Sequence, residues 1–164
     1  MKKNILTVEE SIRLSEKLKQ QGKQIVLAGG CFDILHLGHI KFLESAKKLG
    51  NILFVLVEGD ESVKKLKGKN RPINNQNERA KVLAALEVID YVVLLPQMKT
   101  DKDYDKLITQ INPDFIAATQ DDPNILHKKR QTKLVGGKLK IVTKRIESKS
   151  TTKLAKLISK QNIL

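Results

Sequence analysis

The stretch Gly29–His39, which reads GGCFDILHLGH, decides the fold of this chain. It follows Gln24–Ala28, a short β-branched and apolar run that is typical of a buried strand. Apolar residues then recur at helical spacing over residues 40–50, and Gly50 is typical of a helix C-terminus. The sequence therefore predicts a strand, a glycine-rich turn and a helix that begins near two histidines.

The predicted turn has three features that suit a phosphate group. Gly29 and Gly30 let the backbone approach a ligand without a Cβ atom in the way. The start of the following helix presents unpaired N–H groups and the positive end of the helix dipole. His36 and His39 share one face of a helical turn, where imidazoles can donate to phosphate oxygens, and Gly38 keeps the path open. We favour a ligand-binding pair over two ordinary surface histidines.

Length and composition limit the class of protein. The chain has 164 residues and one cysteine, and it contains no apolar run of the roughly eighteen residues that a membrane span needs. We expect one domain over residues 1–164, with residues 1–22 as an N-terminal helical extension, in the cytoplasm. Cys31 is expected to fill space in the turn rather than act as a nucleophile, because no neighbouring residue marks it as activated.

The charge is strongly positive, with a formal net charge of +13. Residues 127–164 hold twelve Lys or Arg and one acidic residue, Glu147. A nucleic-acid-binding domain is therefore one interpretation. Against it, the lysines are scattered, and no helix-turn-helix, zinc-finger or RNA-recognition motif is present. A basic cleft also steers a nucleotide triphosphate or a sugar phosphate, so nucleic acid is the less favoured partner.

Strands and helices alternate about five times along the chain. Strands are expected at 24–28, 51–57, 91–95, 115–118 and 139–142. Helices are expected at 8–21, 40–50, 77–89, 101–111, 123–135 and 150–161. This order predicts an α/β fold, a Rossmann-like three-layer sandwich with a five-stranded parallel sheet and helices on both faces. Ligands should lie beyond the C-terminal ends of its strands.

Two further corners of the predicted sheet carry polar residues. Asp60 follows the strand 51–57, where it can contact a ribose, a substrate hydroxyl or a metal, or cap a short helix over residues 61–66. The basic segment 64–73 follows, and it can close over a triphosphate or remain a solvated charged loop. Both interpretations of each feature stay open.

Two helix starts are also informative. Arg79 lies near the start of helix 77–89, where the helix dipole disfavours a cation, so we expect an anionic partner for it. Ser150, Thr151 and Thr152 begin the last predicted helix. A single hydroxyl would suffice as a cap, and three in a row favour an added role as donors to phosphate.

The segment Gly30–His39 resembles the signature of the cytidylyltransferase-like nucleotidyltransferase superfamily, which has the form G-x-F-D-x-x-H-x-G-H. Residues 66–74, 78–86 and 88–93 are similar to one branch of it, the heptose-1-phosphate adenylyltransferases. Glycerol-3-phosphate cytidylyltransferases share the core but usually carry Trp where this chain has Leu37, which favours ATP over CTP. The resemblance covers nearly the whole chain.

The resemblance implies roles for individual residues. His36 and His39 would stabilise the triphosphate in the transition state, while Lys67 or Lys69 and Arg145 would neutralise phosphate charge. The implied catalytic residues are His36, His39, Lys67 and Arg145. The implied nucleotide-binding residues are Gly30, Cys31, Phe32, Gly38, Arg79, Asp121, Ser150, Thr151 and Thr152. The implied substrate-binding residues are Asp33, Asp60, Lys69 and Arg71. No residue is assigned as a metal ligand.

The resemblance also implies the reaction, the transfer of AMP from ATP, with Mg²⁺, to a heptose 1-phosphate-like acceptor with release of pyrophosphate. Two departures put the acceptor in doubt. Where the heptose branch has Lys-Gly-Gly-Asp-Tyr, only Asp121 matches, and its Gly-Ile is replaced by Ser148-Lys149. Alternatives are a glycerol-3-phosphate cytidylyltransferase and an FAD-synthetase-like adenylyltransferase. Expected partners are ATP, a phosphorylated small acceptor and a second copy in a homodimer.

Overall fold

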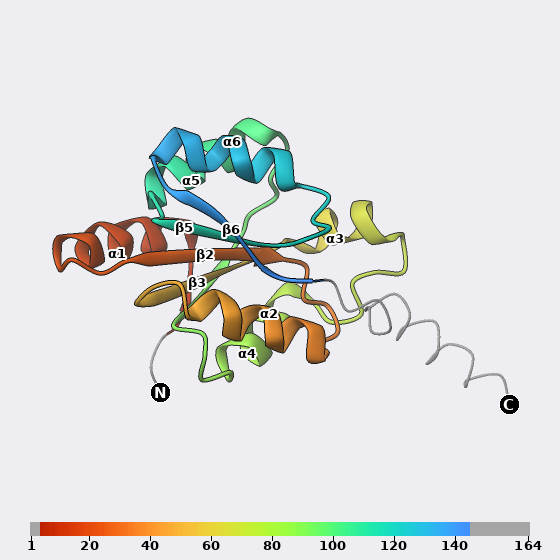
Figure 1. The fold of residues 1–164 in the computed structure, drawn as a ribbon. Helices are drawn as coiled ribbons and strands as arrows, with labels where there is room; N and C mark the ends of the chain where they lie inside the picture. The colour runs from red at the N-terminus through yellow and green to blue at the C-terminus, as the bar shows by residue number, and fades with distance from the viewer. Residues whose placement is uncertain (1–3, 145–164) are drawn as a thin grey trace, which may run out of the picture.

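The computed structural model describes residues 4–144, and within them it contains one parallel sheet flanked by helices on both faces (Figure 1). The strands are β1 (Ile5–Leu6), β2 (Ile25–Gly30), β3 (Ile52–Val57), β4 (Tyr91–Leu94), β5 (Phe115–Thr119) and β6 (Lys138–Thr143). The helices are α1 (Val8–Gln20), α2 (Leu37–Lys47), α3 (Asp60–Lys67), α4 (Gln76–Ala84), α5 (Asp101–Ile111) and α6 (Ile125–Val135). The predicted α/β sandwich is confirmed, and the predicted helix 150–161 lies outside the described residues.

The sheet has six strands in the order β1-β4-β3-β2-β5-β6, so the prediction of five strands is wrong. The additional strand, β1, pairs in parallel with β4, Ile5 opposite Val92 and Leu6 opposite Val93. Two residues are too short to show the alternation that identifies a strand in a sequence. Pairing with an existing strand, and not local propensity, therefore creates β1.

Alternating residues of the strands feed two separate cores. On one face, α2 and α4 bury Phe42, Leu43, Ala80 and Leu83 against Val26, Val55 and Val57. On the other face, α1 and α5 bury Leu18, Leu107, Ile108 and Ile111 against Leu27, Phe54 and Leu56. Strands β2 and β3 are buried on both faces, which explains why their sequences are apolar without interruption.

Several helix boundaries follow from their caps. Thr7 and Glu10 form a capping box at the start of α1. Helix α3 begins at Asp60 itself, and its N-cap, Gly59, makes no side-chain cap. Helix α4 ends at Ala84, five residues before its predicted end, because turn-like i→i+3 bonds from Leu86 and Ile89 replace the helical pattern. No helix within residues 4–144 is long and apolar enough to cross a membrane.

The C-terminal ends of the central strands meet at one edge of the sheet. Gly30 of β2 lies opposite Val57 of β3, and Val57 lies opposite Leu94 of β4. The chain leaves β2 for β3 on one side, while β5 pairs with β2 on its other side. The crevice between β2 and β5 is therefore the topological switch point, where open parallel sheets bind ligands.

Candidate active site

The histidines of the turn after β2 stack on one another. His36 is the N-cap of α2, and its Nδ1 accepts a hydrogen bond from the Gly38 N–H at 3.1 Å. Because Nδ1 accepts, the proton of the neutral His36 ring lies on Nε2. The ring centroids of His36 and His39 are 3.9 Å apart with an interplanar angle of 23°. The predicted placement of both rings on one face of a helix start is confirmed.

Phe32 packs against one member of this pair, His39. Its ring packs edge-on against His39, with the centroids 5.2 Å apart. A Cβ atom on Gly30 would lie 3.1 Å from the Phe32 ring, so the glycine leaves the space that the phenylalanine occupies. Phe32 itself has φ = 47°, a left-handed conformation that costs a non-glycine residue roughly 1–2 kcal/mol. The turn thus holds the two imidazoles through a strained, buried phenylalanine.

His39 is an uncharged imidazole near neutral pH. Burial lowers its pKa from the usual 6.5 to about 4, helped by the nearby His36 and Lys67. Its Nδ1 is buried and, among the described residues, has no hydrogen-bond partner. A phosphate near these rings would reverse the electrostatic effect, because an anion favours the protonated form. A negatively charged ligand would therefore raise the pKa of His39 and strengthen its role as a hydrogen-bond donor.

A cavity of about 700 Å³ opens beside the histidines, a volume suited to a small ligand. It lies at the C-terminal ends of β2, β3 and β5 and reaches the facing ends of α5 and α6. Ten predicted site residues line it: Gly30, Cys31, Phe32, Asp33, His36, Gly38, His39, Lys67, Arg71 and Asp121. The structure thus brings the residues of the turn, the end of α3 and the β5 corner together around one space.

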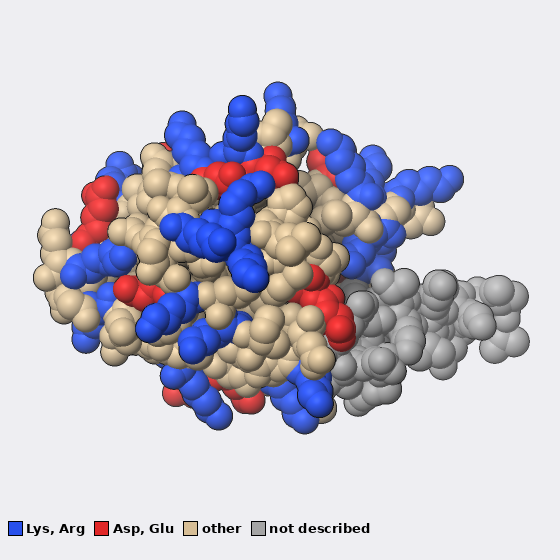
Figure 2. All heavy atoms as spheres, turned by 45° about the horizontal axis from the view of Figure 1, so that its top comes forward, with Lys and Arg blue, Asp and Glu red and all other residues tan. Residues whose placement is uncertain are grey.

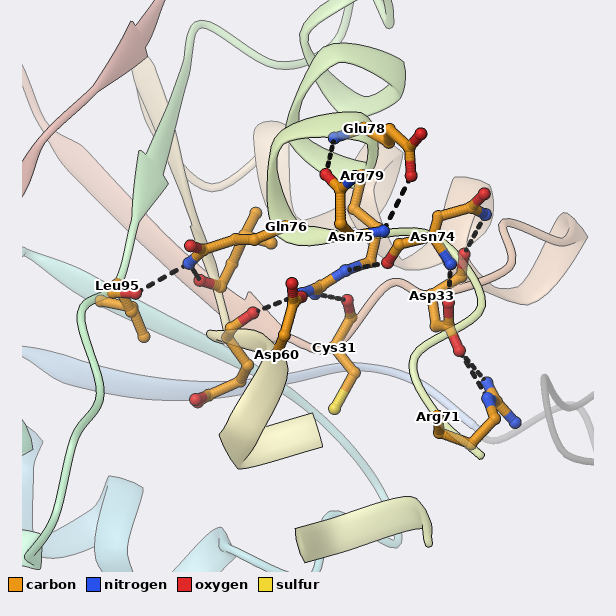
Figure 3. Close-up of polar contacts among 12 residues, drawn as sticks. Cys31, Asp33, Asp60, Arg71, Asn74, Asn75, Gln76, Glu78, Arg79 and Leu95 are labelled. Carbon is orange, nitrogen blue, oxygen red and sulfur yellow. Dashed lines mark hydrogen bonds and ion pairs between the residues drawn. The ribbon is translucent and has the colours of Figure 1, made fainter. Parts of the chain in front are cut away.

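Arg79 does not line the cavity, and its guanidinium contacts other residues of the chain (Figure 3). Its guanidinium is buried and donates to the backbone carbonyls of Cys31, Glu58 and Asn74. It also pairs with Asp60 at 2.6 Å. The expected anionic partner of Arg79 is therefore a carboxylate of the chain itself, and Asp60 does not line the cavity.

Asp33 is similarly satisfied by the chain. Its buried carboxylate accepts hydrogen bonds from the backbone N–H groups of Ile73 and Asn74 at 2.8 and 3.0 Å, and it pairs with Arg71. Figure 3 shows how these contacts join the segment before α4 to the turn after β2. Asp33 and Arg71 both line the cavity, but the Asp33 carboxylate and the Arg71 guanidinium pair with each other.

The other predicted site residues that the structure describes do not line the cavity. Lys69 is one of them, whereas Lys67, in the last turn of α3, does line it. Arg145, Ser150, Thr151 and Thr152 lie outside the described residues.

Cys31 lies in the turn after β2. Burial raises the pKa of its thiol, and its backbone carbonyl accepts a hydrogen bond from Arg79. These observations support the expected space-filling role of Cys31.

Sequence reasoning missed a carboxylate and a phenol on the wall of the cavity. Glu58 follows β3 directly, and Tyr104 of α5 donates its hydroxyl to both Glu58 oxygens, at 3.1 and 2.9 Å. Burial raises the pKa of the Glu58 carboxyl, and burial together with the nearby Glu58 raises the pKa of the Tyr104 hydroxyl. The position of Glu58 at a strand end is a signal that could have identified it, while Tyr104 is brought in only by tertiary packing.

The opposite wall of the cavity carries two further pairs of polar residues. Lys128 of α6 lies 2.6 Å from Asp122, and His127 Nδ1 lies 3.2 Å from Asp101 of α5. All four residues line the cavity. Within residues 4–144 there is no cluster of three or more His, Cys, Asp or Glu that could hold a metal ion.

The chain is similar in sequence to curated bacterial proteins of one kind. Bifunctional protein HldE of Aliarcobacter butzleri is 43% identical over 155 residues, which are 94% of this chain and 31% of that protein. HldE of Nitratiruptor is 51% identical over 108 residues, 66% of this chain and 22% of that protein. The chain thus spans less than a third of the length of these relatives.

Solved structures extend the comparison. A lipopolysaccharide core biosynthesis protein from Thermoplasma volcanium is similar with a TM-score of 0.59 and 33% identity, over 76% of this chain and 98% of that one. Pantoate-β-alanine ligase of Francisella tularensis has a TM-score of 0.66 at 15% identity, over 88% of this chain and 68% of that one, and shares the fold alone. Residues 27–158 match the cytidylyltransferase-like family, and this chain belongs to that family.

Proposed function

We propose that the chain is an adenylyltransferase that transfers AMP from ATP to a sugar phosphate resembling heptose 1-phosphate and releases pyrophosphate. The observation that carries the proposal is the stacked pair of His36 and His39 at the N-terminus of α2, on the wall of the cavity at the switch point. Imidazole donors, helix N–H groups and the helix dipole all favour a polyphosphate at this position. Membership of the cytidylyltransferase-like family supports the class of reaction.

In the proposed reaction, a phosphate oxygen of the acceptor attacks the α-phosphorus of ATP in line. A new P–O–P bond forms, the bond between the α-phosphorus and the bridging oxygen breaks, and pyrophosphate leaves with the electron pair. Because no covalent intermediate with the chain is needed, the chain contributes positioning and charge stabilisation. His36 donates through Nε2, and His39 and Lys67 stabilise the charge that develops on the phosphates.

Mg²⁺ is expected to enter the site together with ATP. Bound to a triphosphate, Mg²⁺ neutralises charge and orients the leaving group. Cationic side chains of the protein also neutralise phosphate charge, and Lys67 lines the cavity close enough to His39 to lower the pKa of that imidazole.

The choice of acceptor rests on relatives. The HldE proteins and the lipopolysaccharide core biosynthesis protein are similar over most of this chain, and the sequence resembles heptose-1-phosphate adenylyltransferases. The positive charge is consistent with two anionic substrates. Figure 2 shows Lys and Arg spread over the visible face, with Asp and Glu between them.

A matrix of nucleotides and acceptors tests the proposal. The purified chain is incubated with ATP or CTP, Mg²⁺, and heptose 1-phosphate, glycerol 3-phosphate or flavin mononucleotide, and pyrophosphate release is measured. We expect ATP with heptose 1-phosphate to give the fastest release. Preference for CTP or for another acceptor would replace the named substrate. Salt-sensitive binding of duplex nucleic acid without any turnover would contradict the enzymatic proposal.

Two further expectations remain proposals. A homodimer would be seen as twice the chain mass in sedimentation equilibrium. A cytoplasmic location would be seen by fractionation of cells that express the natural protein.

A further inference from the structure

The cavity has a second polar centre, on the opposite face of the sheet from α2. Side chains of a strand alternate between faces, so Glu58, which continues β3, lies on the same side as Leu56 and Phe54. Both of these belong to the core formed with α1 and α5. The Tyr104 hydroxyl meets Glu58 on that side (2.9 and 3.1 Å), between β3 and α5.

Glu58 is a carboxylate without a cationic partner in the described part of the chain. The ion pairs of residues 4–144 leave Glu58 out, although Arg79 donates to its backbone carbonyl. A carboxylate can accept about four hydrogen bonds, and the hydroxyls of Tyr104 and Ser62 each donate to Glu58. Because burial of a carboxylate with unfilled acceptor sites is costly, this position can take further neutral or cationic donors. Burial accordingly raises the pKa of the Glu58 carboxyl.

The residues around Glu58 indicate which kind of ligand could donate hydrogen bonds to it. Leu56, Leu95 and Ile108 form an apolar wall next to Glu58 and Tyr104. Such a wall accommodates the carbon skeleton of a small ligand, while the two oxygens of a carboxylate match a pair of neighbouring hydroxyls. A phosphate is excluded from contact with Glu58 by like-charge repulsion, so the ligand's phosphate must point toward His36 and His39.

The topology indicates which substrate reaches this wall. The switch point, where nucleotides bind in open parallel sheets, lies between β2 and β5. Glu58 lies on the other side of β2, at the end of β3. We infer that Glu58, oriented by Tyr104, selects the acceptor of the proposed transfer by accepting hydrogen bonds from two neighbouring hydroxyls of its sugar. This inference rests on the proposed function and specifies its second substrate as a polyol phosphate.

The variants Glu58→Gln and Tyr104→Phe test the inference with little change in volume. Glu58→Gln should raise the KM for heptose 1-phosphate about tenfold or more, since a hydrogen bond to a charged group is lost, and leave the KM for ATP unchanged. Tyr104→Phe should have a smaller effect on the same constant. Glu61→Gln, an exposed carboxylate on α3 outside the cavity wall, is the matched control and should behave like the wild type.

Deoxy analogues distinguish a direct contact from a structural role. With the wild type, sugar 1-phosphates that lack one of the contacted hydroxyls should lose about tenfold in kcat/KM. In Glu58→Gln this loss should shrink to less than about threefold, because the partner is already gone. Equal losses in both proteins for every analogue would overturn the inference. Coupling of Glu58 to the 2′- or 3′-hydroxyl of ATP would overturn it in favour of a ribose contact, and a preference for phosphocholine or phosphoethanolamine in favour of an ammonium contact.

Calorimetric binding separates this inference from the proposed function. Heptose 1-phosphate should bind to the wild type and bind about tenfold or more weakly to Glu58→Gln, whether or not turnover occurs. Loss of binding in the variant without turnover in the wild type would contradict the adenylyltransferase proposal and leave the Glu58 contact standing. Equal binding to both proteins would overturn the Glu58 contact alone.

Discussion

Two groups of polar residues lie in or against the turn after β2, and they differ in whether residues of the chain occupy their hydrogen-bonding and charged groups. His36 and His39 stack at the start of α2 on the cavity wall, and the buried Nδ1 of His39 has no partner among the described residues. Arg79 and Asp33 lie next to them, and their charged groups are occupied by backbone and side-chain partners of the chain. The two groups are neighbours in the fold, so contacts within the chain, rather than proximity to the turn, distinguish a structural group from a binding group.

The difference has an energetic reason. A buried guanidinium without partners is very costly, so the fold surrounds Arg79 with carbonyls and the Asp60 carboxylate. These contacts connect the ends of β2 and β3, the start of α3 and the segment before α4. Arg79 and its partners therefore fix the conformation of the turn that carries His36 and His39.

The largest expected effect is on stability, from breaking the scaffold. Arg79→Met should lower the free energy of unfolding by about 3–5 kcal/mol, because it leaves the Asp60 carboxylate and three carbonyls without their buried donor. Urea denaturation followed by circular dichroism measures this. Arg79→Lys keeps the charge but not the fork of donors, and it should be destabilised by an intermediate amount.

A direct nucleotide contact by Arg79 predicts the opposite pattern. In that case, Arg79→Met would raise the KM for ATP while the denaturation midpoint remained that of the wild type. This outcome would remove the distinction between the two groups.

A smaller effect concerns the pH dependence of stability. The pKa of His39 is lowered to about 4 by burial, so the unfolded chain binds this proton more readily than the folded chain does. The stability that neutral His39 contributes is fully present above pH 6.5 and is lost as the pH falls from 6.5 to about 4. The free energy of unfolding should fall by at most about 3 kcal/mol over this range. Partial exposure of the His39 ring makes the fall smaller than the full pKa shift implies.

The variant His39→Gln isolates this effect. Its free energy of unfolding should change less than that of the wild type between pH 6.5 and 4, and equally above pH 6.5. Parallel curves for the two proteins over the whole range would show that His39 is not the group that titrates.

The smallest expected effect compares two lysines of the same basic segment. Lys67 lines the cavity and Lys69 does not. Lys67→Ala should lower kcat/KM for ATP by about tenfold through loss of phosphate attraction, and Lys69→Ala should leave it within about twofold. Steady-state pyrophosphate release measures both. Equal losses in the two variants would show that the segment acts through its overall charge rather than through one positioned side chain.

Much of the fold could be predicted from the sequence because β2, β3 and α5 carry strong local patterns. Uninterrupted apolar runs mark the two buried strands, and α5 lies over residues 101–111, as predicted. The strand β1 could not be predicted, because its two residues become a strand only through pairing with β4. The early end of α4 likewise depends on turns after Ala84 that its apolar spacing does not reveal.

The candidate site was predictable where its residues are close in sequence. His36, Gly38 and His39 are within one turn of helix, so their spacing alone places them together. Glu58 and Tyr104 meet across 46 positions, and no local pattern joins them. The sequence does not reveal that the Arg79 guanidinium has partners within the chain, and its nucleotide contact stays a prediction.

The most direct test of the central proposal, that the His36–His39 pair stabilises the reacting phosphates of ATP, is kcat for pyrophosphate release in His36→Ala and His39→Ala, with ATP and heptose 1-phosphate both saturating. We expect kcat to fall by about 10²–10³ in each variant, with the KM for ATP changed much less and the fold retained. Turnover at the wild-type rate in both variants would contradict the account.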